Sequence, residues 1–355
     1  MKVGYDAQAF LSPNGGNGKG AQLRTLLGPF IDTFVGFAST DQNLSGLPLI
    51  QEGASRYNLW QQFSLPSSLR RHQIDLFLSP YNTAPFFLPQ GIDLILVLHD
   101  TILMKGFRKP DMHGLIVDTY RRWQIPYSVA RARVVLTVSE HAHADILREF
   151  PDANVRVIPC TLPPRWFQPV PLQDREDYLL MVTSSAPHKN ASGAIEAYSQ
   201  YVQRVGSHAK PLKVVGLSDV ASVFQKRLAT RGITSTVTFL PFVLEAELIR
   251  LYQKATAVLL PSFAEGFGIP MLEAMATGTP VIAARATSLP EVGGDAATYF
   301  DPHDTTDIAA VLESTLTSDR LLLDMADRGL ERVKQYHPSL VAQQVSAFWH
   351  EMAAV

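Results

Sequence analysis

Two acidic side chains, Glu265 and Glu273, stand on either side of a Gly-Phe-Gly turn, with seven residues between them. The apolar run "TAVLLP" at 256–261 predicts a buried strand before the turn, and "PMLEAMATG" at 270–278 predicts a helix after it. Glu265 therefore belongs to the loop that follows the strand, and Glu273 to the first turn of the helix. Two acids at these places need a chemical explanation.

The loop amides and the helix N-terminus together predict an anion site, because unpaired N–H groups and the helix dipole both favour negative charge there. Glu273 would repel a bare phosphate, but it fits if it accepts hydrogen bonds from hydroxyl groups attached to that phosphate, such as those of a ribose. Glu265 could do the same for a sugar, and glycines let the backbone approach a ligand. The spacing alone leaves a simpler interpretation open, in which Glu273 complements the helix dipole and Glu265 is a solvated loop acid.

Short apolar runs recur along the chain and alternate with helical patterns, which is typical of an α/β fold with parallel sheets buried on both faces. The runs in the first half are at 2–6, 33–38, 75–79, 94–98 and 133–138. The runs in the second half are at 177–183, 212–216, 236–240, 256–261 and 279–284.

The alternation divides into two halves joined by a proline-rich stretch at 159–177 that has no periodicity. We therefore predict a Rossmann-like domain at 1–165, a second at 175–335 and a final helix at 338–355. Ligands of open α/β sheets bind beyond the carboxyl ends of the strands. Two such domains facing each other would form a cleft, with site residues on the loops after strands of both halves.

The composition is that of a globular protein, with 46% apolar and 18% charged residues and a net charge of −2. No overall basic charge favours nucleic acid as a partner. The single cysteine, Cys160, excludes an intrachain disulfide, no apolar run approaches the roughly 20 residues of a membrane span, and the N-terminus enters a strand almost directly. We expect a cytoplasmic protein, and peripheral association with the inner face of the membrane stays open.

The stretch "EGFGIPMLEAMATGTPV" at 265–281, followed by "SLPEVGGDAATYFDP" at 288–302, resembles the signature of the retaining glycosyltransferases of family four, including its mannosyltransferases. That family has the GT-B fold of two Rossmann-like domains. The resemblance implies that the domain at 1–165 is the acceptor side and that the domain at 175–335 binds the nucleotide sugar. It also implies that the helix at 338–355 packs back on the first domain, although an amphipathic helix that only packs on a core would show the same pattern. The resemblance implies that Glu265 and the backbone of the adjoining loop hold the donor sugar, and that Glu273 binds the ribose hydroxyls. The loop residues concerned are Gly266, Phe267, Gly268 and Ile269.

Other segments match the same family. "NGGNGKGAQL" at 14–23 places Gly16 and Gly18 in the loop that closes over the donor phosphates, although a glycine-rich turn alone is weak evidence. "LILVLHD" at 94–100 places His99 where the family has a histidine that points at the donor sugar; on its own, a histidine at a strand end is more often structural.

The phosphate-binding segment of the family is represented by "MVTSSAPHKN" at 181–190. Lys189 keeps the place of the lysine that grips the diphosphate, while Ser184 stands where the family usually has arginine. This departure removes one positive charge, and the Ser184 hydroxyl can supply one hydrogen bond instead. In the segment at 237–252, backbone groups near Val243 would border the nucleobase.

Basic and aromatic residues gather at 106–125, which fits either a solvated helix face or contact with a lipid-linked or polyanionic acceptor. The adjoining histidines His141 and His143 are spaced i, i+2 and do not share a helix face, so we predict no metal site there.

The resemblance predicts a metal-independent retaining glycosyltransferase without a cofactor, which moves a hexose from a nucleotide-diphosphate sugar (GDP-mannose-like or UDP-sugar) to a glycan or lipid-linked acceptor in polysaccharide biosynthesis, lipopolysaccharide included. His99, Glu265 and Lys189 would be catalytic. The acceptor hydroxyl would attack from the face that the diphosphate leaves, and a phosphate oxygen would take its proton. Two alternatives remain: a sugar-nucleotide epimerase of the same architecture, and an inactive subunit that binds sugar nucleotides.

Overall fold

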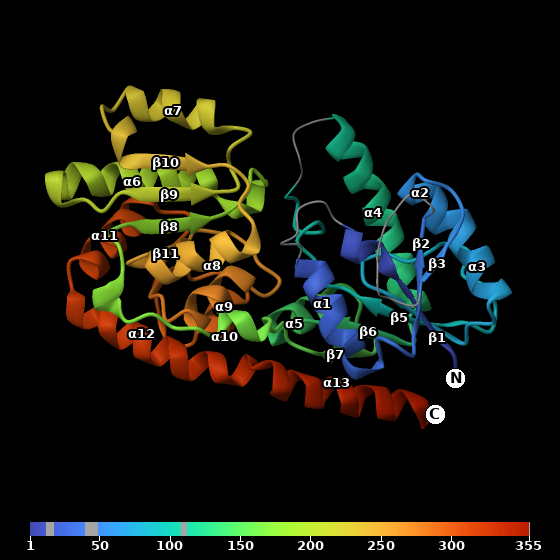
Figure 1. Ribbon diagram of the computed structural model, residues 1–355. Helices are drawn as coiled ribbons and strands as arrows, with labels where there is room; N and C mark the ends of the chain where they lie inside the picture. The colour runs from blue at the N-terminus through green and yellow to red at the C-terminus, as the bar shows by residue number, and fades with distance from the viewer. Residues whose placement is uncertain (12–17, 40–48, 108–111, 355) are drawn as a thin grey trace. The chain divides into compact units, whose positions relative to one another are not determined.

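The computed structural model describes residues 1–11, 18–39, 49–107 and 112–354 (Figure 1). The chain forms two compact units. Unit 1 combines Met1–Thr161 with Pro338–Val355, and unit 2 is Leu162–His337. The predicted linker at 159–177 thus contributes its residues from Leu162 onward to unit 2.

Unit 1 is built on a seven-stranded parallel sheet in the order β3-β2-β1-β4-β5-β6-β7. The strands are β1 (Val3–Asp6), β2 (Val35–Ala38), β3 (Leu49–Gln51), β4 (Leu76–Ser79), β5 (Asp93–Val97), β6 (Val134–Thr137) and β7 (Val155–Val157). The helices of this unit are α1 (Gly18–Leu27), α2 (Tyr57–Leu59), α3 (Leu65–Arg71), α4 (Met112–Arg131), α5 (Glu140–Glu149) and α13 (Pro338–Ala353).

The final helix, α13, completes the core of unit 1 on one face of the sheet. It packs against α1, and Figure 1 shows the two helices side by side, α13 in red and α1 in blue. Its apolar face joins the core cluster through Val341, Val345, Phe348, Trp349 and Met352. The Trp349 indole also donates a hydrogen bond to the Leu26 carbonyl at 2.7 Å, which satisfies its buried N–H.

Unit 2 is built on a six-stranded parallel sheet in the order β10-β9-β8-β11-β12-β13. The strands are β8 (Leu179–Val182), β9 (Leu212–Val215), β10 (Val237–Leu240), β11 (Ala257–Leu260), β12 (Val281–Ala284) and β13 (Ala297–Phe300). The helices are α6 (Ala191–Val205), α7 (Ala221–Ala229), α8 (Glu245–Lys254), α9 (Ile269–Ala276), α10 (Leu289–Gly293), α11 (Thr305–Leu316) and α12 (Asp319–Val333).

Each sheet contains a switch point, a pair of neighbouring strands from which the chain adds further strands in opposite directions. It lies between β1 and β4 in unit 1 and between β8 and β11 in unit 2. Ligands of open α/β sheets bind beyond the carboxyl ends of the strands at such points. The loops that follow these four strands are therefore the first places to look for a site.

The predicted α/β class with two parallel sheets is confirmed, and all ten predicted strands are present. Three further strands, β3, β7 and β13, were not predicted. Each lies at the edge of its sheet, and most of their residues are only partly buried. Such strands lack the continuous apolar run by which central strands of a parallel sheet are identified.

Candidate functional site

The loop after β8 carries Lys189 and is anchored to the loop after β11. Asn190 has a left-handed backbone (φ 52°) at the start of α6, and its side-chain amide donates to the carbonyls of Pro261 at 3.1 Å and Pro302 at 2.9 Å. The Phe263 amide donates to the His188 carbonyl at 2.8 Å. Two loops that are far apart in sequence are therefore held together at the switch point of unit 2.

Lys189 and Glu265 form an ion pair at this point. The Lys189 ammonium lies 2.7 Å from one Glu265 oxygen and 2.9 Å from the other, and the Ser262 hydroxyl donates to Glu265 at 2.6 Å. Their side chains are only 24% and 15% exposed. Burial alone would raise the pKa of Glu265, but Lys189 and the Ser262 hydrogen bond hold that pKa below its usual value. Glu265 is thus ionised at neutral pH.

The backbone of Glu265 is fixed from the loop after β12. Its amide donates to the Thr287 hydroxyl oxygen at 2.8 Å, and its carbonyl accepts from the Ser288 hydroxyl at 3.0 Å. Thr287 holds a left-handed backbone (φ 48°), which is strained for a β-branched residue. Ser262, Thr287 and Ser288 were not predicted from the sequence; the hydroxyl-bearing residues within "PSFAEGFG" and "ATSLPEV" are the only sequence signal for them.

The Gly-Phe-Gly turn brings the backbone from Glu265 into α9. Phe267 is buried and meets the Tyr336 ring edge-on, so only its backbone faces the loop. Gly268 has φ 99°, and a Cβ there would lie 2.6 Å from Leu289, so glycine is required both by conformation and by space. The positive end of the α9 dipole, beginning at Ile269, therefore adjoins the Lys189–Glu265 pair along the chain.

Glu273 lies one turn further along α9 and is partly exposed. Burial raises the pKa of this carboxyl to about 7; the Tyr252 hydroxyl opposes the rise and the charge of Glu245 adds to it. Near neutral pH, Glu273 therefore exchanges between protonated and ionised forms. Hydroxyl donors of a ligand would favour the ionised form.

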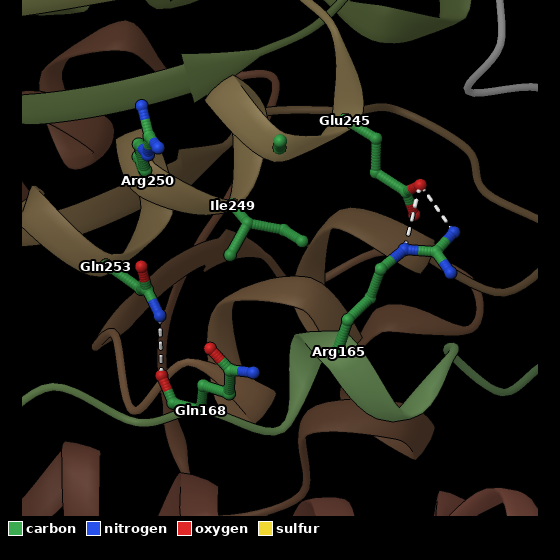
Figure 2. Close-up of a pocket in the computed structure, with 7 residues that line it drawn as sticks. Arg165, Gln168, Glu245, Ile249, Arg250 and Gln253 are labelled. Atoms are coloured by element: carbon green, nitrogen blue, oxygen red, sulfur yellow. Dashed lines mark hydrogen bonds and ion pairs between the residues drawn. The ribbon is translucent and has the colours of Figure 1, made fainter.

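Glu245, at the start of α8, is itself held by the segment after the unit boundary. Arg165 donates to one of its oxygens at 3.0 Å through Nε, and the Trp166 indole donates to the other at 2.9 Å. Figure 2 shows this ion pair at one end of a pocket and the 2.8 Å hydrogen bond from Gln253 to the Gln168 carbonyl at the other. No predicted site residue lines the pocket, so we do not assign it to the donor.

The remaining predicted residues of unit 2, Ser184 and Val243, lie beyond the carboxyl ends of strands of the same sheet. Ser184 follows β8, and its hydroxyl accepts a long hydrogen bond (3.4 Å) from the Ala186 amide. Val243 lies between β10 and α8 and is partly exposed. The roles of Ser184 and Val243 stay predictions.

The predicted residues of unit 1 follow β1 and β5. His99 is partly exposed; its amide donates to Asn82 at 3.1 Å, and its Nε2 lies 3.2 Å from the Pro80 carbonyl, which places a proton on that nitrogen. Gly18 is the first residue of α1, and Gly16 lies outside the described residues. Residues 108–111 of the basic segment at 106–125 also lie outside them.

Within the described parts of the chain, no three His, Cys, Asp or Glu side chains are grouped as metal ligands would be. No helix among the described residues is long and apolar enough to cross a membrane.

Two family models match the chain on either side of the unit boundary. The model described as "Glycosyltransferase Family 4" matches residues 28–165, and that described as "Glycosyl transferases group 1" matches residues 164–332. Together they extend over nearly the whole chain.

Curated relatives include three bacterial mannosyltransferases. O-antigen chain mannosyltransferase B of Escherichia coli is 29% identical over 76% of this chain and 73% of its own length. O-antigen chain mannosyltransferase RfbU of Salmonella typhimurium is 33% identical over 64% of this chain and 61% of its own. MMP alpha-(1->4)-mannosyltransferase of Mycolicibacterium hassiacum is 31% identical over 66% of this chain. The match spans only 59% of that last relative.

Solved structures share the fold over the full length. HepE of Anabaena, solved in complex with UDP and glucose, superposes with a TM-score of 0.77 at 18% identity and covers 99% of this chain and 100% of its own. Sucrose-phosphate synthase from Thermosynechococcus elongatus gives a TM-score of 0.74 at 17% identity over 99% and 98% of the two chains. The solved structures show the GT-B fold, and the family models with the curated relatives show the class of protein, a glycosyltransferase.

Within that class, the chain has a family 4 glycosyltransferase domain at 28–165, followed by a group 1 glycosyltransferase domain at 164–332. The resemblance inferred from "EGFGIPMLEA" is thereby confirmed, as is the prediction that the protein is an enzyme that transfers sugars.

Proposed function

We propose that this protein transfers a hexose, with mannose the first candidate, from a nucleotide-diphosphate sugar to a glycan or lipid-linked acceptor in the synthesis of an O-antigen-like polysaccharide. The names of the curated relatives support mannose and the O-antigen setting. The resemblance of the signature at 265–281 supports retention of the anomeric configuration.

The observation that carries the proposal is the arrangement at the β8–β11 switch point. A cation and an ionised acid form a pair where ligands of such sheets bind, and the loop that carries the acid leads into the N-terminus of α9. The α9 N-terminus and Lys189 suit the diphosphate, and the acceptor oxygens of Glu265 suit the hydroxyl groups of a sugar. Glu273, one turn further along α9, suits the ribose between diphosphate and base.

In this proposal Lys189 changes partners when the donor binds. A diphosphate brings negative charge to the ammonium and competes with Glu265 for it, and Glu265 then has oxygens available for the sugar hydroxyls. As the glycosidic bond breaks, negative charge grows on the diphosphate, and Lys189 and the α9 dipole are already in place to stabilise it. Glu265 would stabilise the positive charge that develops at the sugar ring.

The acceptor hydroxyl then attacks from the face that the diphosphate leaves. A leaving phosphate oxygen takes the hydroxyl proton. Because attack and departure share one face, the new glycosidic bond keeps the original configuration, and no side-chain nucleophile is needed. His99 would contact the donor sugar from unit 1. We propose that neither a metal nor a cofactor takes part.

A panel assay tests the function. The full chain is incubated with GDP-mannose and with UDP-hexoses in the presence of a lipid-linked mannosyl acceptor, with and without excess chelator, and nucleoside diphosphate release is measured. The proposal predicts release from at least one donor, undiminished by chelator, an α-linked product from an α-linked donor, and loss of release in Glu265→Gln. Binding without release from any donor would instead support the inactive subunit, and a product with an inverted sugar hydroxyl would support the epimerase.

A further inference from the structure

The switch point of unit 1 contains a group of side chains to which the proposed mechanism assigns no role. β1 ends at Asp6 and β4 at Ser79, and the two strands are direct neighbours in the sheet. This is the counterpart of the place in unit 2 where Lys189 and Glu265 meet. In an open α/β sheet it is the favoured position for a ligand.

Asp6 is fully buried at this point, with an exposed fraction of 0%. One oxygen accepts from the Gln8 amide at 2.9 Å, and the other accepts from the Tyr57 hydroxyl at 3.0 Å. Burial raises the pKa of Asp6 to about 7, and the two hydrogen bonds only partly oppose the rise. A carboxyl kept in such surroundings is costly, and groups of this kind concentrate at functional sites.

A local structural role explains only half of this arrangement. The bond from the Gln8 amide is the side-chain cap of the turn at Ala7–Leu11, and any Asp or Asn at position 6 would supply it. The second bond reaches Tyr57, which is 51 residues away in α2. It fixes the orientation of an aromatic ring rather than the course of the backbone.

Tyr57 and Tyr81 present two partly exposed rings above the buried acid. The ring centroids lie 5.5 Å apart at an angle of 64°. The Tyr57 hydroxyl donates to Asp6 and also accepts from the Gln61 side chain at 2.9 Å, so its ring is held from two sides. Pockets for small neutral ligands commonly combine aromatic walls with a few fixed polar groups. The C–H faces of a sugar ring fit such walls.

The two rings are connected to His99, the residue of unit 1 predicted to meet the donor sugar. His99 bonds Pro80 through its ring and Asn82 through its amide, and Tyr81 lies between these two residues in the chain. The segment that positions His99 therefore also positions one of the rings.

We propose that Tyr57 and Tyr81 form an acceptor subsite that binds the terminal sugar ring of a neutral glycan, with Asp6 and Gln61 as the residues that position Tyr57. This inference rests on the proposed function, since an acceptor is needed only if a sugar is transferred. It adds the contact residues in unit 1 and the chemical class of the group bound.

The test measures sugar binding separately from nucleotide binding. Methyl α-glycosides of mannose, glucose, galactose and N-acetylglucosamine are titrated into the full chain in the presence of saturating nucleoside diphosphate, and binding is followed by saturation-transfer NMR. The variants are Tyr57→Phe, which releases the ring, and Tyr81→Leu, which keeps apolar bulk but removes the ring. Tyr127→Phe is the matched control, because it also loses one phenol hydrogen bond in unit 1, to the Phe86 carbonyl.

We expect at least one glycoside to bind the wild type, about tenfold weaker binding in Tyr81→Leu, a several-fold loss in Tyr57→Phe, and no change in Tyr127→Phe. Nucleoside diphosphate affinity, measured calorimetrically on the same samples, should be the same in all four proteins. The inference is overturned if no glycoside binds the wild type, or if the variants and the control bind alike. Failure of nucleotide binding in the wild type would contradict the proposed function itself, so the two failures are distinguishable.

Discussion

At the scale of single residues, the main finding is that Lys189 and Glu265 neutralise each other. The resemblance implied that Lys189 binds the diphosphate and that Glu265 binds the sugar, as separate contacts. The structure joins them in one ion pair with two hydrogen bonds. Lys189 therefore lowers the pKa of Glu265, and a substitution of either residue removes the ion pair.

Lys189→Ala should affect stability as well as turnover. It leaves Glu265 largely buried without its cation, so the pKa of Glu265 should rise, and the ionised acid should destabilise the fold by about 1–3 kcal/mol at neutral pH. The wild-type pair supplies its stabilisation above the unfolded pKa of the acid and loses it as pH falls through the lower folded value. Donor-dependent kcat/KM should fall about tenfold to a hundredfold.

Thermal melting and steady-state kinetics check this prediction, with the exposed Lys226→Ala as a control in the same unit. A Lys189→Ala protein that melts and turns over like the wild type would show that other groups neutralise both Glu265 and the diphosphate.

Glu273 should make nucleotide binding depend on pH. Its pKa of about 7 means that raising the pH from 6 to 8 converts most of the carboxyl to the ionised form, which accepts hydrogen bonds from ribose. Nucleoside diphosphate affinity should therefore increase over this interval and level off above it. Glu273→Gln should bind more weakly at pH 8 and lose the increase. Titrations at several pH values check this prediction, with the exposed Glu247→Gln as the control, which should keep the wild-type profile. The assignment is contradicted if Glu273→Gln keeps that profile too.

At the scale of secondary-structure elements, the Glu265 loop owes its position to the loop after β12. Thr287 and Ser288 bind the amide and the carbonyl of Glu265, and Thr287 adopts a strained backbone to do so. Strain of this kind persists where the surrounding structure fixes it. The carboxylate is thus oriented by a segment that does not itself contact the sugar in the proposed mechanism.

Thr287→Val keeps the branched shape but removes the oxygen that accepts from the Glu265 amide. We expect kcat/KM for the donor to fall about tenfold, because a misplaced Glu265 loses part of its contact with the sugar. Free nucleotide affinity should stay within about twofold, since Glu273 on α9 is untouched. Thr287→Ser, which keeps the oxygen, should recover most of the activity; equal losses in both variants would assign the effect to backbone strain alone.

Most elements that the sequence predicted have a uniform environment; the edge strand β10 is an exception, because it was predicted although Val237 is its only buried residue. Central strands such as Leu94–Val97 are buried on both faces and appear as unbroken apolar runs. The edge strands β3, β7 and β13 have mixed burial and no such pattern. The same reasoning applies to the site: Glu265 and the glycines have recognisable spacing, whereas Thr287 reaches Glu265 only through tertiary structure, across 22 positions of chain.

At the scale of the whole molecule, unit 1 is assembled from both ends of the chain. α13 is encoded after the whole of unit 2, yet its apolar side chains complete the core beside α1. The core of unit 1 is therefore incomplete without the apolar side chains of α13. The predicted domains at 1–165 and 175–335 are continuous segments of sequence, whereas unit 1 combines two separate segments that pack together.

Trp349→Ala tests this dependence. It removes a buried indole and its hydrogen bond to Leu26, and large-to-small changes of this kind cost about 3–5 kcal/mol. In scanning calorimetry we expect the transition assigned to unit 1 to shift to lower temperature while that of unit 2 stays in place. Leu340→Ala, on the exposed face of the same helix, should change neither transition. An unshifted unit 1 transition in Trp349→Ala would mean that α13 is dispensable for that core.

The central claim is that unit 2 divides the donor between two acids, with Glu273 on the nucleotide and Glu265 on the sugar. The most direct test is calorimetric titration of GDP and UDP into the wild type, Glu273→Gln and Glu265→Gln, with turnover measured on the same samples. The account predicts that Glu273→Gln weakens free nucleotide binding about tenfold. It predicts that Glu265→Gln binds free nucleotide at least as well as the wild type, because Lys189 is released, and yet loses turnover. Equal losses of nucleotide affinity in both variants, or no loss in either, would contradict it.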